Sequence, residues 1–256
     1  MGRDKMADMI EQIANLMRLT QNAVVVTGAG ISTEAGIPDF RGDKGIYRQL
    51  GEDRVMRIIN IDFFKAHPDQ FYSFYRQYFK FPEVEPSPAH KILARLEEQG
   101  MIKGVVTQNI DNLHQQAGSR NVIAVHGNAE EFICMNSHCQ KIYDHEYFAD
   151  NTETVPHCSA CGAVIKPNVV LFGENINNYI GARQLILDAR LLIVIGSSLT
   201  VYPLAGFVNE FCTLAKDLVI INKGPTQLDY AARYKLDVGV GSTGEILEEI
   251  YRKLQR

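Results

Sequence analysis

Near its start the chain carries a glycine turn whose backbone could bind a phosphate. Gly28-Ala29-Gly30 directly follows residues 23–27, Ala-Val-Val-Val-Thr, a short apolar run typical of a buried parallel strand. Glycines at such a turn let backbone N–H groups approach a pyrophosphate closely. Because the next glycine is Gly36, the G-x-G-x-x-G pattern of dehydrogenases is incomplete. Taken alone, these residues fit a dinucleotide site and a ligand-free strand-to-helix turn equally well.

A second loop gathers amide and carboxylate side chains within four positions. Gln108, Asn109 and Asp111 follow the apolar residues 104–107, at the end of an expected strand. Their donors and acceptors suit the amide and ribose groups of a ligand. The competing interpretation is a helix N-cap, in which Asn109 or Asp111 accepts backbone N–H groups at the start of the next helix. This stretch by itself favours the cap.

A histidine ends a further strand pattern. His126 and Gly127 follow residues 122–125, Val-Ile-Ala-Val, where the apolar run stops. Imidazole can accept a proton near neutral pH, so a histidine in this loop is a candidate general base. A lone histidine at a strand end is more often structural, and this alternative stays open at this point.

Four of the five cysteines have the spacing of a zinc site. They form two pairs, Cys134-x4-Cys139 and Cys158-x2-Cys161, with 18 residues between the pairs. Four thiolates complete a tetrahedral shell and leave no position for water, so the metal is expected to hold the segment together and not to perform chemistry. His138 and His157 lie next to cysteines of the set, which leaves a mixed ligand set open.

The elements that must position these residues alternate along the chain. Apolar strand patterns occur at 23–27, 104–107, 122–125, 191–195 and 218–221, and helical patterns at 4–18, 87–99, 181–189, 204–215 and 243–254. This alternation predicts an α/β fold with a doubly wound, parallel, Rossmann-like sheet, whose loops at the strand ends bind the ligand.

Two segments do not fit the alternation of strands and helices, and we interpret them as insertions that form a smaller domain. Residues 43–84 are rich in Phe and Tyr at mixed helical spacing, and 129–167 surround the cysteines. The aromatic residues are expected to be mostly core. The expected domains are a discontinuous dinucleotide-binding domain (1–42, 85–128 and 168–256), a helical insertion (43–84) and a zinc-binding insertion (129–167).

Composition narrows the classes of function. The chain has 256 residues, 46% of them apolar, and a net charge of −4, from 26 Lys and Arg against 30 Asp and Glu. That charge gives no general attraction to nucleic acid or to an anionic membrane. The sequence has neither an apolar run of spanning length nor a signal-peptide pattern at its start, so we expect a cytoplasmic enzyme.

Taken together, the motifs resemble the sirtuin (Sir2) family of NAD-dependent protein deacylases, of the bacterial or archaeal type, over about residues 20–240. The resemblance lies in Gly28-Ala-Gly-Ile-Ser-Thr33, Gly36-Ile-Pro-Asp-Phe-Arg-Gly42, Thr107-Gln-Asn-Ile-Asp111, His126-Gly127, the four cysteines, Phe172-Gly-Glu-Asn175 and Gly196-Ser-Ser198, in the same order as in the family. The first and third of these motifs are specific to that family.

The resemblance implies a role for each matching position. The NAD site would comprise Gly28, Ala29, Gly30, Thr33, Asp39, Phe40, Arg41, Gln108, Asn109, Ile110, Asp111, Gly196, Ser197, Ser198, Asn222 and Lys223. His126 would be the catalytic base and Asn109 would take part in catalysis. An acyl-lysine peptide would pair with Val169, Val170, Phe172, Gly173, Glu174 and Asn175, and Cys134, Cys139, Cys158 and Cys161 would bind structural Zn²⁺. The products would be the free lysine, nicotinamide and O-acyl-ADP-ribose.

The acyl group is inferred from one position. Family members that remove succinyl groups carry a Tyr-x-x-Arg pattern, whereas the matching stretch here is Tyr72-Ser-Phe-Tyr75-Arg76. A shift of one residue rotates a helical side chain by about 100°, which directs Arg76 away from the acyl pocket. We therefore expect a preference for acetyl and other neutral acyl groups.

Three other functions are compatible with parts of the pattern. The same NAD pocket could deliver ADP-ribose to a protein side chain. A non-catalytic NAD-binding or zinc interaction module is disfavoured because it would need neither His126 nor the complete stretch 108–111. An ordinary dehydrogenase would need an acidic residue after its second strand, and none is identifiable.

Overall fold

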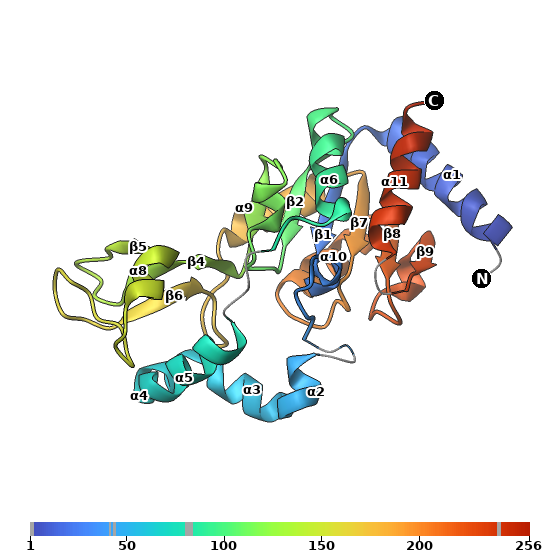
Figure 1. Cartoon of the computed structure of the whole chain (residues 1–256). Helices are drawn as coiled ribbons and strands as arrows, with labels where there is room; N and C mark the ends of the chain where they lie inside the picture. The colour runs from blue at the N-terminus through green and yellow to red at the C-terminus, as the bar shows by residue number, and fades with distance from the viewer. Residues whose placement is uncertain (1–2, 41, 43–44, 80–83, 240–241) are drawn as a thin grey trace.

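The computed structural model describes residues 3–40, 42, 45–79, 84–239 and 242–256, and its larger lobe is built on a parallel sheet (Figure 1). Six strands pair in the order β3-β2-β1-β7-β8-β9. Their bounds are β1 Ala23–Thr27, β2 Ile102–Thr107, β3 Val122–Ala124, β7 Leu191–Ile195, β8 Asp217–Asn222 and β9 Tyr234–Asp237. All five pairings are parallel. The predicted doubly wound sheet is confirmed; the edge strand β9 was not expected.

Helices cover both faces of this sheet because its central strands are apolar on both sides. Along β1, Val25 packs with α1 (Arg3–Thr20), α6 (Pro88–Glu98) and α11 (Thr243–Leu254). Val24 and Val26 face α9 (Tyr179–Asp188) and α10 (Leu204–Cys212) on the other side. A strand alternates its side chains between faces, so an unbroken apolar run such as 23–26 has to be buried on both.

The smaller lobe brings both insertions around one aromatic core, on the left and along the bottom of Figure 1. The helical insertion forms α2 Ile46–Leu50, α3 Glu52–Ile58, α4 Ile61–Ala66 and α5 Pro68–Tyr78, and the cysteine-containing insertion contributes β4 Gly127–Cys134, β5 Ile142–Asp144, α8 His145–Asp150 and β6 Ile165–Val169. Tyr75 of α5 lies edge-on to Phe148 and Phe132, with ring centroids 5.8 and 6.1 Å apart. The Tyr75 hydroxyl donates to the carbonyl of Ala129 (3.2 Å). The two segments therefore fold as one unit.

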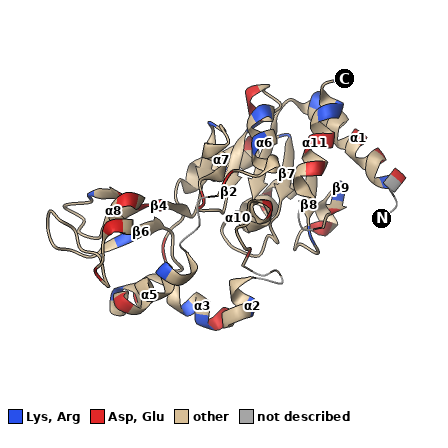
Figure 2. Ribbon diagram, viewed as in Figure 1, with Lys and Arg blue, Asp and Glu red and all other residues tan. Residues whose placement is uncertain are grey.

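Charge is distributed over both lobes without a dominant sign, as Figure 2 shows. Positions of Lys and Arg and positions of Asp and Glu are both found on helices of each lobe, in keeping with the small net charge of −4. None of the helices in the described ranges combines the length and the apolar character that a bilayer crossing needs.

Candidate active site

The strand order reverses direction at β1, and this places a cleft between the ends of β1 and β7. From β1 the chain moves outward to β2 and β3, then returns to β7 on the other side. Parallel sheets bind ligands at such a point. Here the two turns touch: a Cβ on Gly30 would lie 2.7 Å from Gly196 Cα, and one on Gly28 would lie 2.8 Å from Gly196 O. Gly28 and Gly30 are therefore required for this close contact, and Gly196 is required for its φ of +62°.

A cavity of about 690 Å³ opens at this point and extends between the lobes. Its volume lies in the range of ordinary ligand pockets. Of the residues expected to bind NAD, it is lined by Gly28, Ala29, Gly30, Thr33, Asp39, Phe40, Gln108, Asn109, Ile110, Asp111, Gly196, Ser197, Ser198, Asn222 and Lys223, together with His126 and the peptide residues Val169, Val170, Phe172, Gly173 and Glu174. Arg41 lies outside the described residues. Asn175 is exposed and does not line the cavity.

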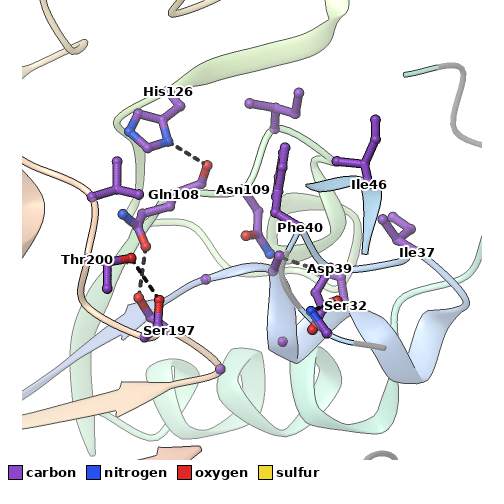
Figure 3. A pocket seen from close by; sticks show the side chains of 18 of the residues that line it. Ser32, Ile37, Asp39, Phe40, Ile46, Gln108, Asn109, His126, Ser197 and Thr200 are labelled. Carbon is purple, nitrogen blue, oxygen red and sulfur yellow. Dashed lines mark hydrogen bonds between the residues drawn. The ribbon is translucent and has the colours of Figure 1, made fainter. Parts of the chain in front are cut away.

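His126 is held with one nitrogen bonded and the other available. Its Nδ1 lies 3.0 Å from the carbonyl oxygen of Gln108, which can only accept, so Nδ1 carries the proton and Nε2 is the basic atom (Figure 3). Burial lowers the pKa of His126, and the bond to Gln108 offsets only part of that effect. The imidazole is therefore neutral at neutral pH and can accept a proton.

Steric constraints explain why the residue after this histidine is a glycine. Gly127 has a φ of +87°, and a Cβ there would lie 2.0 Å from the carbonyl oxygen of Asn168. On the other side, the carbonyl of His126 accepts from Val170 N (2.7 Å). The segment that carries the histidine is thereby joined to residues 168–170, of which Val169 and Val170 belong to the predicted peptide-binding segment.

Asn109 and Asp111 are connected through Ser32, which is fully buried. Asn109 Nδ2 donates to Ser32 Oγ (3.0 Å), and Ser32 Oγ donates to Asp111 Oδ2 (2.6 Å). The other carboxylate oxygen of Asp111 accepts from Leu113 N (3.0 Å) at the start of α7 (Leu113–Gln116). Asp111 therefore satisfies the first N–H group of this helix, although Asn112 is the N-cap residue, and it also lines the cavity. Burial raises its pKa, against the lowering effect of these hydrogen bonds.

A second polar link joins the β2 and β7 loops at the end of the cavity near His126. Ser197 Oγ donates to Gln108 Oε1 (2.9 Å), and Ser198 Oγ lies 3.0 Å from Thr200 Oγ1. Gln108 thus orients His126 through its carbonyl and contacts the β7 loop through its side chain (Figure 3).

A buried lysine stabilises the segment that is expected to bind a peptide. Lys166 Nζ donates to Glu174 Oε2 (2.9 Å) and to the carbonyl of Val169 (2.6 Å), and Glu174 Oε2 also accepts from Leu171 N (2.9 Å). Phe172 pairs through its backbone with residues 59–61 of the helical insertion. Backbone groups of Val170 and Phe172 in this segment are therefore already bonded to other parts of the chain.

The four cysteines converge at one end of the small sheet. The Sγ atoms of Cys134, Cys139, Cys158 and Cys161 all lie within 4.8 Å of one another. His157 points instead to Glu153 Oε2 (3.2 Å), and within the described ranges the cysteines are the only group of three or more potential metal ligands. The soft, all-thiolate donor set fits a closed tetrahedral Zn²⁺ site, as predicted.

Several cavity residues were not singled out from the sequence. Ser32, Ile37, Ile46, Tyr78, Phe79, Thr200, Val201, Tyr202 and Thr243 line it as well. Ser32 was within a recognised motif but had no role assigned to it, although its place two residues after Gly30 indicates a side chain near the turn. Ile37 likewise lies within the recognised motif 36–42, and Thr200, Val201 and Tyr202 closely follow the motif 196–198. Ile46, Tyr78, Phe79 and Thr243 line the cavity through tertiary packing, which no local pattern reveals.

Arg76 points away from the cavity, as the helical spacing predicted. Its guanidinium donates to the carbonyl of Glu153 (2.8 Å) and lies 4.5 Å from the ring centroid of Phe148. Tyr72 is buried and bonds to the carbonyl of Ile165. Neither residue lines the cavity. The acyl preference itself stays a prediction.

Comparisons with known proteins agree with this geometry. The model of the Sir2 family matches residues 28–203. An NAD-dependent protein deacetylase of Thermotoga maritima is 43% identical over 247 residues, covering 94% of this chain and 98% of the relative. A Sir2 structure with a deacetylated p53 peptide and 3′-O-acetyl-ADP-ribose superposes with a TM-score of 0.86 at 40% identity, covering 94% of this chain and 97% of that one. A Sir2Tm structure with a propionylated peptide has a TM-score of 0.81 at 39% identity, covering 96% and 97%. The chain belongs to the Sir2 family.

Proposed function

We propose that this protein is an NAD-dependent protein lysine deacetylase that transfers the acetyl group to ADP-ribose and releases nicotinamide and O-acetyl-ADP-ribose. The observation that carries the proposal is the single cavity that contains a neutral, oriented imidazole at His126 and the Ser32–Asn109–Asp111 network. A module that only bound NAD would need no base with its Nε2 available.

The NAD side of the cavity is assigned to the loops at the ends of β1, β2, β7 and β8. NAD supplies an activated bond between nicotinamide and ribose, whose cleavage lets the ribose accept the acyl oxygen of a modified lysine. Asn109 and Asp111 hold the carboxamide and ribose, and hydrogen bonds through Ser32 fix the positions of these two side chains relative to each other. Phe40, which packs against Tyr47 with ring centroids 5.5 Å apart, covers the reacting centre against water.

His126 acts as the base. Gln108 fixes the ring, so that Nε2 accepts the proton of a ribose hydroxyl, and this hydroxyl then attacks the carbon of the transferred acyl group. General bases of this kind contribute roughly 10²- to 10⁴-fold to rate.

The substrate is an acyl-lysine peptide that adds as a strand to residues 169–174, with main-chain hydrogen bonds supplying affinity. Acetyl is the preferred acyl group and longer neutral chains are alternatives, because Arg76 is directed away from the cavity and supplies no charge for an acyl carboxylate. Zn²⁺ on the four cysteines stabilises the smaller lobe and takes no part in the chemistry. The cytoplasmic location expected from the sequence stays a prediction.

The test is nicotinamide release from NAD with and without an acetyl-lysine peptide. We expect release that depends on the peptide and falls at least about 100-fold in His126→Ala. His145→Ala, which removes an exposed histidine of the smaller lobe, is the matched control and should retain full activity. Release at the native rate from His126→Ala would contradict the assignment. Transfer of ADP-ribose to the peptide, detected as a mass gain, would favour the transferase alternative.

A further inference from the structure

A chain of buried polar groups lies behind the cavity, between the first two strands and α7. Thr27 Oγ1 donates to Thr107 Oγ1 (2.8 Å), and His114 Nε2 lies 2.9 Å from Thr27 Oγ1. Thr27 is fully buried, and the exposed fractions of Thr107 and His114 are 2% and 1%. Burial of a polar group lowers the stability of the fold unless the group is hydrogen-bonded, so these three buried side chains depend on one another for their hydrogen bonds.

The direction of these bonds determines the protonation of His114. Thr27 gives its only hydroxyl proton to Thr107, so it has to accept from His114, and Nε2 carries the imidazole proton. Burial lowers the pKa of His114 to about 3, which keeps the ring neutral. The ring can therefore supply one N–H donor, and the structure uses it on Thr27. His114 Nδ1 has no hydrogen-bond partner within the part of the chain that the structure describes.

This series of hydrogen bonds ends at the loop that carries Asn109 and Asp111. Thr107 Oγ1 accepts from the backbone N–H of Asn109 (3.1 Å) as well as from Thr27, so both of its lone pairs are used. The same loop is fixed one turn later, where Asp111 accepts from Leu113 N. With its backbone held in this position, Asn109 donates through Nδ2 to Ser32 Oγ (3.0 Å).

We propose that His114 is a positioning residue for the NAD site, and that it holds the Asn109 loop in place through Thr27 and Thr107. The inference rests on the proposed function only for the identity of the ligand. His114 touches neither the cavity nor the reacting atoms, so its contribution is geometric. A histidine that only filled space would do so equally well without the N–H group.

Three variants separate these two roles. His114→Gln places an amide N–H about where Nε2 lies, His114→Leu removes the donor but keeps bulk, and Thr27→Val breaks the chain with an isosteric side chain. The first measurement is amide hydrogen exchange, by mass spectrometry, of peptides that cover residues 108–112 in the intact protein. We expect faster exchange in the Leu and Val variants by about tenfold, and nearly native exchange in the Gln variant.

The second measurement is the affinity for NAD, by calorimetry on the folded proteins. His114→Leu and Thr27→Val should each weaken binding about tenfold, the double variant should be no weaker than either, and Gln should recover most of the loss. Native exchange in the Leu and Val variants, or equal losses with Gln and Leu, would overturn the proposal. Failure of the native protein to bind NAD would instead overturn the proposed function, because the exchange measurement tests the loop without a ligand.

Discussion

Replacing Ser32 by alanine should disable the site without disturbing the fold. Ser32 is fully buried and bonds Asp111 at 2.6 Å and Asn109 at 3.0 Å. A hydrogen bond to a charged group is worth about 1.5–3 kcal/mol, and tenfold in an equilibrium or rate corresponds to about 1.4 kcal/mol. Ser32→Ala should therefore lower kcat/KM for NAD by roughly 10- to 150-fold. It should also raise the pKa of Asp111 further, because a bond that favours the carboxylate is lost.

The assay is kcat/KM for NAD, from nicotinamide release at saturating acetyl-lysine peptide, measured from acid to neutral pH. In Ser32→Ala the acid limb should move to higher pH, since the carboxylate is protonated more easily. Ser119→Ala is the matched control: Ser119 is also buried, but its hydroxyl has no hydrogen-bond partner among the described residues. An Ser32→Ala enzyme within twofold of native, with an unmoved acid limb, would refute this reasoning.

Three further predictions concern the metal, the base and the glycine turn. The Tyr143 hydroxyl donates to Cys158 Sγ (3.1 Å). Tyr143→Phe should therefore release zinc to a chelator about 10- to 100-fold faster, measured with a colorimetric zinc indicator. Zinc release at the rate of the native protein would contradict this prediction. Burial lowers the pKa of His126, so kcat should fall with decreasing pH only below the pKa of a free imidazole, about 6.5, and an acid limb above that value would be inconsistent. Gly30→Ala forces a Cβ onto facing backbone and should lower the free energy of unfolding by about 2 kcal/mol, measured by denaturant titration; Gly239→Ala, with space around it, should not.

Local patterns were sufficient for the sheet and for the edge at which the site lies, whereas the individual site residues were assigned through the resemblance to the Sir2 family. The apolar run 23–27 requires burial on both faces, and this alone predicts a parallel strand with helices on either side. The residues at the ends of β1, β2, β7 and β8 could be anticipated because the carboxyl ends of parallel strands share one edge. The edge strand β9 was missed because residues 234–237, Tyr-Lys-Leu-Asp, bury mainly one side chain.

The remaining features depend on contacts between distant segments. Nothing near Tyr75 in the sequence indicates that its ring packs on Phe148 and that its hydroxyl bonds to Ala129. The spacing of the cysteines predicted the metal but not the shared aromatic core of the two insertions. Likewise, the role inferred for His114 depends on two strands and a short helix meeting in space, and the stretch 108–114 alone does not reveal it.

Identification of the products tests the central claim most directly. The native protein should be incubated with NAD and a peptide that carries isotopically labelled acetyl-lysine, and all products analysed by mass spectrometry. If the cavity joins NAD cleavage to deacetylation through His126, the label should appear in O-acetyl-ADP-ribose, in equal amounts with nicotinamide and deacetylated peptide. Label recovered only as free acetate at the earliest times, or nicotinamide released without loss of acetyl from the peptide, would contradict the account.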